Sequence, residues 1–175
     1  MKYRPILFSG PMVRALLDGR KTQTRRVVKT KSHHQIEERD DGSLWPWMYD
    51  GERDADAWMS CPYGQPGDRL WVRETWAQPD RRSAGFGPYI YAADWQERPK
   101  HHWNPSIHMP RLASRITLEV TGVRVERLQD ITPCDAVAEG LQRLPASGRY
   151  VVTNGDQYMG LSLIHISEPT RLLSI

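Results

Sequence analysis

Hydrophobic and polar positions along this 175-residue chain predict a mainly β protein with two short helices. A first strand is predicted over residues 3–8, and the apolar positions that follow have helical spacing over residues 11–17. Asp18-Gly19 ends this helix, because glycine accepts the left-handed cap that other residues resist. Residues 22–27 alternate again and predict a second strand.

The periodicity of apolar positions is lost and then regained in the middle of the chain. Residues 29–60 show no sustained period, so we interpret them as a long loop or insertion with a hairpin at Asp41-Gly42. Order returns at the tight turn Pro66-Gly67-Asp68, which leads into a strand over residues 69–76. On that strand, Leu70, Val72 and Glu74 are predicted to share one face.

In the second half of the chain, the pattern predicts a short strand, a long strand and a helix. A short strand is expected at residues 89–93, followed by a loop, and residues 113–127 predict the longest strand with a bend at Gly122. Thr132-Pro133 is a typical helix start, and the helix is expected to run through Leu141.

Composition indicates one folded domain. The hydrophobic content of 39% with seven Trp supports a core, while 26% charged residues and a mean hydropathy of −0.64 make the protein polar. The net charge of +3 and pI near 9.0 permit a nucleic-acid partner without requiring one. No apolar run reaches the length of a membrane span, so we expect no membrane association and a cytoplasmic location. The sequence does not set the oligomeric state.

The turn after the first helix concentrates reactive groups. Lys21 and Thr24 stand beside the three arginines Arg20, Arg25 and Arg26, which suits an anionic or amide-bearing ligand. A hydroxyl needs a neighbouring base, and a lysine serves as one only if burial or another cation lowers its pKa. The three arginines could supply that repulsion. From the pattern alone, a basic solvated strand edge is the favoured interpretation.

Metal and cofactor sites are not predicted. Structural zinc favours closely paired ligands such as Cys-x-x-Cys, whereas Cys61 and Cys134 lie far apart and are expected as reduced thiols. The histidines are interpreted as surface residues of loops. No phosphate loop, nucleophile elbow or dinucleotide fingerprint occurs in the sequence.

The Gly-Arg-Lys-Thr-x-Thr-x-Arg motif at residues 19–26 resembles the signature of ASCH domains, which are small β-barrels of the PUA-like superfamily. The similarity is closest to phage-encoded ASCH proteins and covers most of residues 1–142. It implies an α+β, mainly β fold, in which a small barrel has short helices at its mouth. Residues 1–160 would form this single domain, with an insertion at about residues 30–60.

The resemblance also implies residue roles. Small bacterial ASCH proteins similar to this chain hydrolyse N4-acetylcytidine with a Lys, a Thr and a Glu, which match Lys21, Thr24 and Glu139. Thr24 would attack the amide carbonyl, Lys21 would accept its proton, and Glu139 would assist proton transfer. PUA-like relatives bind RNA or modified bases in a cleft between barrel and helices. The binding candidates are Arg20, Arg25, Arg26, Trp71, Arg73 and Glu74.

Alternatives remain open at this point. Glu139 could be a solvated carboxylate at a helix end, and the Trp71 strand could supply core tryptophan and a structural Arg–Glu pair. The leading expectation is recognition of RNA or a modified nucleoside in a phage or bacterial host, with amidohydrolase activity on an N-acylated cytidine as its enzymatic form. The rivals are a non-catalytic RNA- or base-binding module and a phage accessory protein that binds other proteins.

The end of the chain is expected to be foreign. Residues 161–171 match the in-frame translation of a transposase sequencing adapter without a mismatch. We therefore expect residues 161–175 to be a non-native tail, although periodicity alone would accept their start as a strand. Similar proteins continue to a final Trp/Val-rich strand, so the expected barrel would lack that strand.

Overall fold

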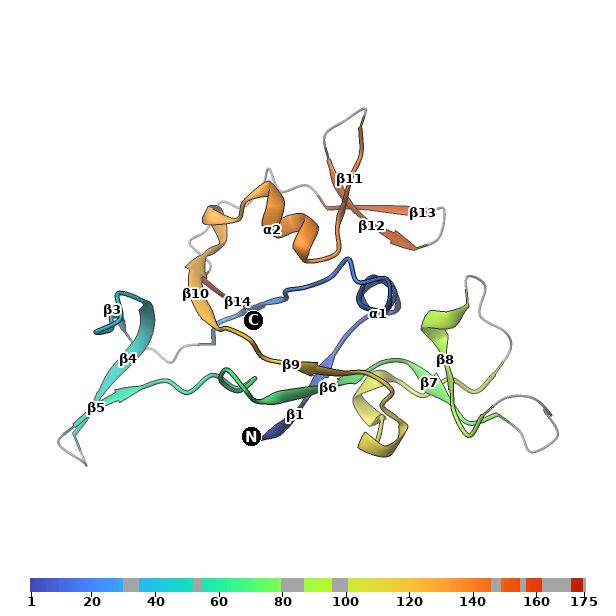
Figure 1. The fold of residues 1–175 in the computed structure, drawn as a ribbon, viewed down its shortest axis with the longest axis horizontal. Coiled ribbons are helices and arrows are strands. Elements are labelled where there is room, and N and C mark those ends of the chain that lie inside the picture. The colour runs from blue at the N-terminus through green and yellow to red at the C-terminus, as the bar shows by residue number, and fades with distance from the viewer. Residues whose placement is uncertain are drawn as a thin grey trace.

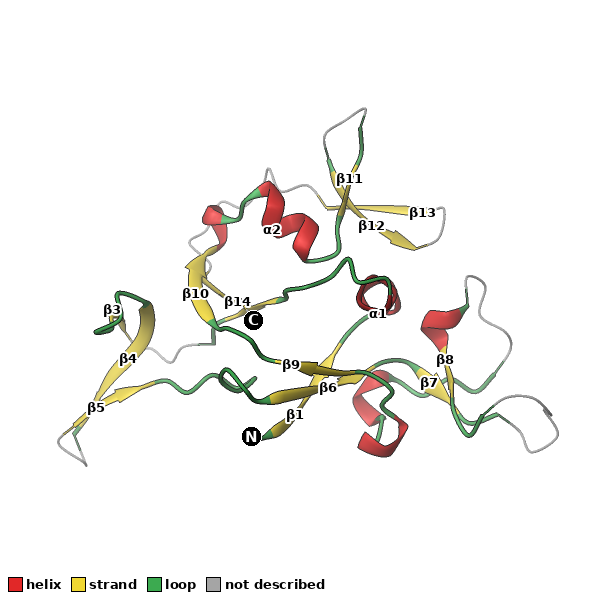
Figure 2. Ribbon diagram, viewed as in Figure 1, coloured by secondary structure: helices red, strands yellow, loops and turns green. Residues whose placement is uncertain are grey.

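The computed structural model describes residues 1–29, 35–51, 55–79, 87–95, 101–145, 149–154, 157–161 and 171–174. Strands predominate and form small open sheets, with few helices (Figure 2). The α+β, mainly β class is therefore confirmed. The strands of the described part of the chain do not close into a barrel, so the PUA-like barrel stays a prediction.

The elements follow one another along the chain as drawn in Figure 1. The helices are α1 (Gly10–Leu17) and α2 (Pro133–Ala138), and the 3-10 turns are η1 (Ala92–Asp94), η2 (Ser106–His108), η3 (Arg111–Ala113) and η4 (Leu128–Asp130). The strands are β1 (Tyr3–Leu7), β2 (Arg25–Val27), β3 (Gln35–Glu38), β4 (Leu44–Asp50), β5 (Ala55–Trp58), β6 (Arg69–Arg73), β7 (Trp76–Ala77), β8 (Ile90–Tyr91), β9 (Thr117–Glu119), β10 (Arg124–Arg127), β11 (Gln142–Arg143), β12 (Tyr150–Asn154), β13 (Gln157–Leu161) and β14 (Arg171–Ser174).

The central sheet has the order β1-β6-β9, with β1 parallel and β9 antiparallel to β6. Its core face carries Ile6 from β1 and Leu70 and Val72 from β6, all nearly inaccessible to solvent. Val13 of α1 packs onto this face, so the apolar side of the helix faces the core, as the helical spacing of apolar positions predicts. Leu70 and Val72 share the core face as predicted, because both belong to the buried cluster on it, whereas Glu74 lies beyond the end of β6.

The insertion is more ordered than a loop. Its strands β3, β4 and β5 form an antiparallel meander, so the loop interpretation is wrong for these segments, while the hairpin at Asp41-Gly42 is confirmed. Trp45 anchors the meander by packing against Val125 of β10. Pro46 inside β4 hid the strand in the sequence, because proline is rare within sheets.

Several predicted elements are shorter than expected. The strand over residues 113–127 is interrupted into β9 and β10, with residues 120–123 between them. The helix that begins after Thr132 ends at Ala138, where Gly140 has a φ of 86°. Thr132 forms a capping box with Asp135, so the predicted helix start is confirmed.

The tail contributes a strand to the fold. The main chain of β14 lies between β10 and β2 and pairs antiparallel with both. Ladder hydrogen bonds join main-chain groups, so a position between two strands makes little demand on the sequence of the strand that fills it. No helix in the described part of the chain is long and apolar enough to cross a membrane.

Candidate functional site

A pocket of about 280 Å³ lies where the turn after α1 meets the central sheet. Its polar side is formed by residues 21–24, and its apolar walls are Phe8, Leu16, Leu70 and Leu118. We call it the Lys21 pocket. Small-molecule sites typically have volumes of about 300–1,000 Å³, so this pocket lies just below that range and suits a ligand as small as one base.

The end of α2 positions Lys21. A main-chain bridge pairs Lys21 with Glu139, and the amides of Thr22 and Gln23 both donate to the Ala138 carbonyl, at 2.8 and 3.1 Å. These contacts use the main chain of residues 22 and 23, so the predicted strand begins only at Arg25.

Gly140 permits this close approach. A Cβ at Gly140 would lie 2.8 Å from Ala15 Cβ and 3.2 Å from Lys21 Cβ, and its φ of 86° disfavours any other residue. The glycine of the Ala138-Glu139-Gly140 segment therefore serves the contact between α2, α1 and the Lys21 turn.

Lys21 is buried, and no carboxylate of the described residues contacts its amine. Only 5% of the residue is exposed, and Nζ donates to the main-chain carbonyls of Gln23 and Glu139, each at 2.9 Å. Burial lowers the pKa of Lys21 to about 8; the charge of Glu139 opposes this shift, and Arg26 and Arg25 reinforce it. Roughly a tenth of the amine is therefore neutral at pH 7.

Thr24 shares the pocket with Lys21. It is 7% exposed and lines the same cavity, so the structure places both predicted residues at one pocket. The Phe8 ring lies beneath the amine, with its centroid 5.5 Å from Lys21 Nζ. A small polar centre against apolar walls is the usual construction of a ligand site.

Arg25 has a different environment from its neighbours. Its side chain is enclosed by three carboxylates: Nε contacts Glu126, Nη1 donates to Glu139 Oε1 at 2.9 Å, and Nη2 lies 2.9 Å from Asp135 Oδ1 at an angle outside hydrogen-bond geometry. Burial opposes the charge of Arg25, but these hydrogen bonds raise its pKa above the ordinary value. The sequence predicts that Arg25 binds substrate. In the structure, the guanidinium nitrogens of Arg25 are instead directed at these three carboxylates.

Glu139 links the two cations. Its main-chain carbonyl accepts from Lys21, whereas its carboxylate is directed to Arg25. Asp135 completes the cluster, because hydrogen bonds from Thr132 and Gln23 hold the pKa of its carboxyl well below the usual range.

The other two arginines of the motif lie outside this cluster. Arg20 forms a surface ion pair with Asp18 at 2.9 Å. Arg26 donates to the Leu7 carbonyl at 2.8 Å, and its guanidinium carbon lies 5.4 Å from the Phe8 ring centroid. Lys21 and Arg26 therefore both lie close to the Phe8 ring.

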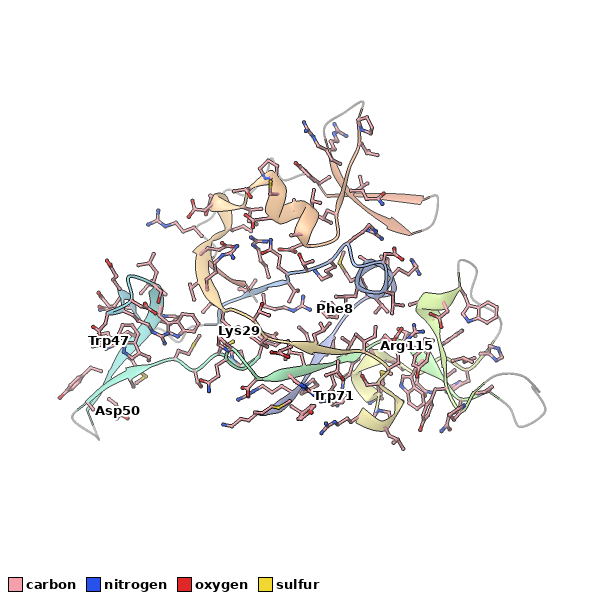
Figure 3. The ribbon with its side chains drawn as sticks, viewed as in Figure 1. Phe8, Lys29, Trp47, Asp50, Trp71 and Arg115 are labelled. Carbon is pink, nitrogen blue, oxygen red and sulfur yellow. The ribbon has the colours of Figure 1, made fainter. Side chains whose placement is uncertain are left out.

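Trp71 and Arg73 do not reach the Lys21 pocket. They project from β6 on the face opposite Leu70 and Val72, and Figure 3 shows Phe8 and Trp71 on opposite sides of the central sheet. Arg73 stacks on Trp71 at 4.6 Å and donates to the Ile107 carbonyl at 3.2 Å.

Glu74 is also away from the pocket. It is 1% exposed and forms a two-pronged ion pair with Arg115, at 2.9 and 3.0 Å. Burial raises the pKa of Glu74, and Arg115 opposes that shift. Glu74 is therefore part of a structural ion pair, but its partner is Arg115 and not Arg73 of the same strand; Arg115 is 41 positions away, where no local pattern could reveal it.

Sequence reasoning missed Phe8 and the wall residues Leu70 and Leu118 as parts of the site. Their apolar character predicted core positions, and nothing in their spacing distinguishes a pocket wall from a core. Both cysteines are free thiols, and the described residues contain no cluster of three or more His, Cys, Asp or Glu that could hold a metal ion.

No protein-family model, curated protein or solved structure matches this chain. Family and function therefore rest on the motif resemblance and on the geometry of the site.

Proposed function

We propose that this chain is an ASCH-type protein that binds RNA or a modified nucleoside in the Lys21 pocket and hydrolyses an N-acylated cytidine amide. One observation carries the proposal: a buried lysine with a pKa of about 8 shares a small cavity with a buried threonine hydroxyl. A hydroxyl attacks an amide only with a base beside it, and a base works best when its pKa lies near the working pH.

The reaction has two stages. Thr24 Oγ1 gives its proton to neutral Lys21 Nζ and bonds to the acyl carbon. The tetrahedral intermediate breaks its C–N bond, and the departing cytosine amine takes the proton from the Lys21 ammonium. Water then attacks the acyl ester on Thr24, again with Lys21 as the base, and releases a carboxylic acid and the free hydroxyl.

Glu139 acts in this scheme as a positioning residue. Its main-chain carbonyl holds Lys21 Nζ at 2.9 Å, and its negative charge keeps the pKa of Lys21 from falling further. Direct proton exchange would require the carboxylate to leave Arg25, which it contacts at 2.9 Å. The apolar walls formed by Phe8, Leu70 and Leu118 suit the face of a base.

The test is hydrolysis of N4-acetylcytidine by the whole chain and by Lys21→Ala and Thr24→Ala. Lys29→Ala and Thr117→Ala are matched controls, because both residues are exposed and neither lines the pocket. We expect both site variants to lose turnover by about 10²-fold or more, and both controls to retain it. Because the neutral amine is the base, kcat/KM should rise with pH and level off above about 8.

A folded parent protein without turnover would overturn the hydrolase. If that protein still bound RNA with an affinity that fell steeply with salt, the non-catalytic binding module would take its place. Turnover that survives in Thr24→Ala would remove the hydroxyl from the mechanism.

A further inference from the structure

A second and larger pocket, of about 470 Å³, lies between the insertion and the central sheet. The start of β1 and the hairpin between β3 and β4 form its walls, and the segment that leads into β6 completes it (Figure 1). The basic side chains of Lys2, Arg4 and Arg39 line it together with Trp45. We call it the Arg39 pocket.

Its guanidinium groups are held in place but not neutralised. Arg39 stacks on Trp45 at 4.2 Å and on Trp58 at 5.1 Å, measured to the ring centroids. Arg4 has a buried Nε without a hydrogen-bond partner among the described residues, while its Nη1 donates to the Pro62 carbonyl at 3.3 Å. Within the described ranges, neither arginine forms an ion pair with a carboxylate.

Within the described ranges the acidic residues of the pocket make no contact ion pair with these arginines; the pKa of Asp68 is lowered mainly by the Lys2 amide, and the charge of Arg4 adds to this shift. Asp68 accepts from the main-chain amides of Lys2 at 2.6 Å and Gln65 at 3.3 Å, and Asp41 accepts from the amide of Ser43 at 2.9 Å. Asp41 feels the charge of Arg39 only at longer range. A stacked guanidinium that makes no ion pair with a carboxylate of the described residues is an arrangement suited to phosphate.

The two pockets are neighbours. Thr121 lines the Lys21 pocket and Val123 lines the Arg39 pocket, so the segment between β9 and β10 separates them. Two residues of extended chain span no more than about 7 Å. The two pockets therefore share this segment as a wall, and a ligand with its base in the Lys21 pocket would reach the Arg39 pocket by crossing it.

We propose that the Arg39 pocket binds a phosphate group, and that the ligand spanning the two pockets is a phosphorylated nucleotide instead of an uncharged nucleoside. The phosphate site depends only on Arg4 and Arg39. The inference that the phosphate belongs to a nucleotide rests on the function proposed for the Lys21 pocket. The phosphate belongs either to an RNA backbone or to a free nucleotide, and the probes below separate these sources.

The experiment measures binding of four probes to the whole chain by calorimetry: inorganic phosphate, cytidine, cytidine monophosphate and a single-stranded RNA trinucleotide with a central cytidine. We expect the phosphorylated cytidine probes to bind at least about tenfold more tightly than cytidine. Tight binding of the trinucleotide alone identifies an RNA backbone, whereas equal binding of the monophosphate identifies a free nucleotide.

Arg39→Gln and Arg4→Gln should remove this difference between the probes and lower the salt dependence of trinucleotide binding by about one unit of slope. Arg143→Gln is the charge-matched control, because Arg143 is exposed on β11 and does not line either pocket. Thermal unfolding midpoints show whether each variant is folded. If Arg39→Gln unfolds, Lys2→Gln tests the opposite wall.

Equal affinity for cytidine and for the phosphorylated probes would overturn the proposal, as would an equal loss in Arg143→Gln. Inorganic phosphate distinguishes the two proposals from each other. Phosphate binding that is lost in Arg39→Gln, in a protein without turnover, sinks the hydrolase and keeps the phosphate site. Turnover without any phosphate-dependent binding does the reverse.

Discussion

Lys21 and Arg25 are both buried cations, four positions apart in one basic stretch, yet their surroundings differ completely. Main-chain carbonyls hold the Lys21 amine, and its pKa is lowered to about 8. Three carboxylates surround Arg25, and its pKa is raised. Burial favours the neutral amine in the first case, whereas the surrounding carboxylates stabilise the charged guanidinium in the second.

The end of α2 creates this difference. Glu139 presents its main-chain carbonyl to Lys21 and its carboxylate to Arg25, so one residue divides its polar groups between the two cations. A carbonyl dipole tolerates a neutral amine, whereas a carboxylate would keep the amine charged. The comparison therefore predicts that variants on the Arg25 side change stability, and variants on the Lys21 side change chemistry.

The largest effect is expected for Arg25→Met. Removing the guanidinium leaves Glu139 without an ion pair among the described residues, and Glu126 and Asp135 with only the exposed Arg124, which should lower the free energy of unfolding by about 3–5 kcal/mol. Denaturant titration measures the loss. Arg124→Met is the control: Arg124 is exposed and pairs with two of the same carboxylates, so its loss should cost less than about 1 kcal/mol. Equal losses would contradict the special status of Arg25.

Gly140→Ala should have the next largest effect, because the added methyl group would push the end of α2 away from Lys21 and Arg25. A Cβ there meets Ala15 and Lys21 in a strained conformation, so we expect a loss of about 3 kcal/mol in stability. Gly19→Ala isolates the strain: Gly19 also has a positive φ, of 70°, but a Cβ added there would have no atom of the described residues within 4 Å. It should cost only about 1 kcal/mol. A similar cost for both variants would show that the close approach does not matter.

Lys21 should give stability an unusual pH dependence. Its pKa is about 8 in the folded protein and 10.5 in an unfolded chain, so between these values the unfolded chain binds more protons and stability rises with pH. The rise amounts to no more than about 3 kcal/mol. Denaturant titrations of the parent and of Lys21→Met over this pH window measure it. The parent should gain stability relative to the variant, and parallel curves would mean that Lys21 has an ordinary pKa.

Glu139→Gln should have the smallest effect and the most specific one. The variant keeps the main-chain contact to Lys21 but removes the charge that raises the pKa of its amine. Turnover should persist, and the midpoint of its pH profile should move below 8. Complete loss of turnover in a folded variant, without such a movement, would instead make Glu139 a direct proton carrier.

The sequence predicted the local features of this site better than its partners. The cap at Gly19, the core face shared by Leu70 and Val72, and the helix start at Thr132 all follow from short-range rules. The same rules could not distinguish Arg25 from Arg26, because their difference lies in contacts with residues 126–139. The strands of the insertion were missed for a related reason: Trp45 is stabilised by packing against Val125, which no window around it contains.

The contact between Lys21 Nζ and the Glu139 carbonyl joins residues 118 positions apart in the chain. Ribosomes add about 5–20 residues per second, so a nascent chain would carry an exposed, fully charged Lys21 for roughly 6–24 seconds before its partner is synthesised. Only then would burial lower the pKa of the amine. We expect the reactive lysine to stay inert through most of translation, and to be activated by the last third of the protein.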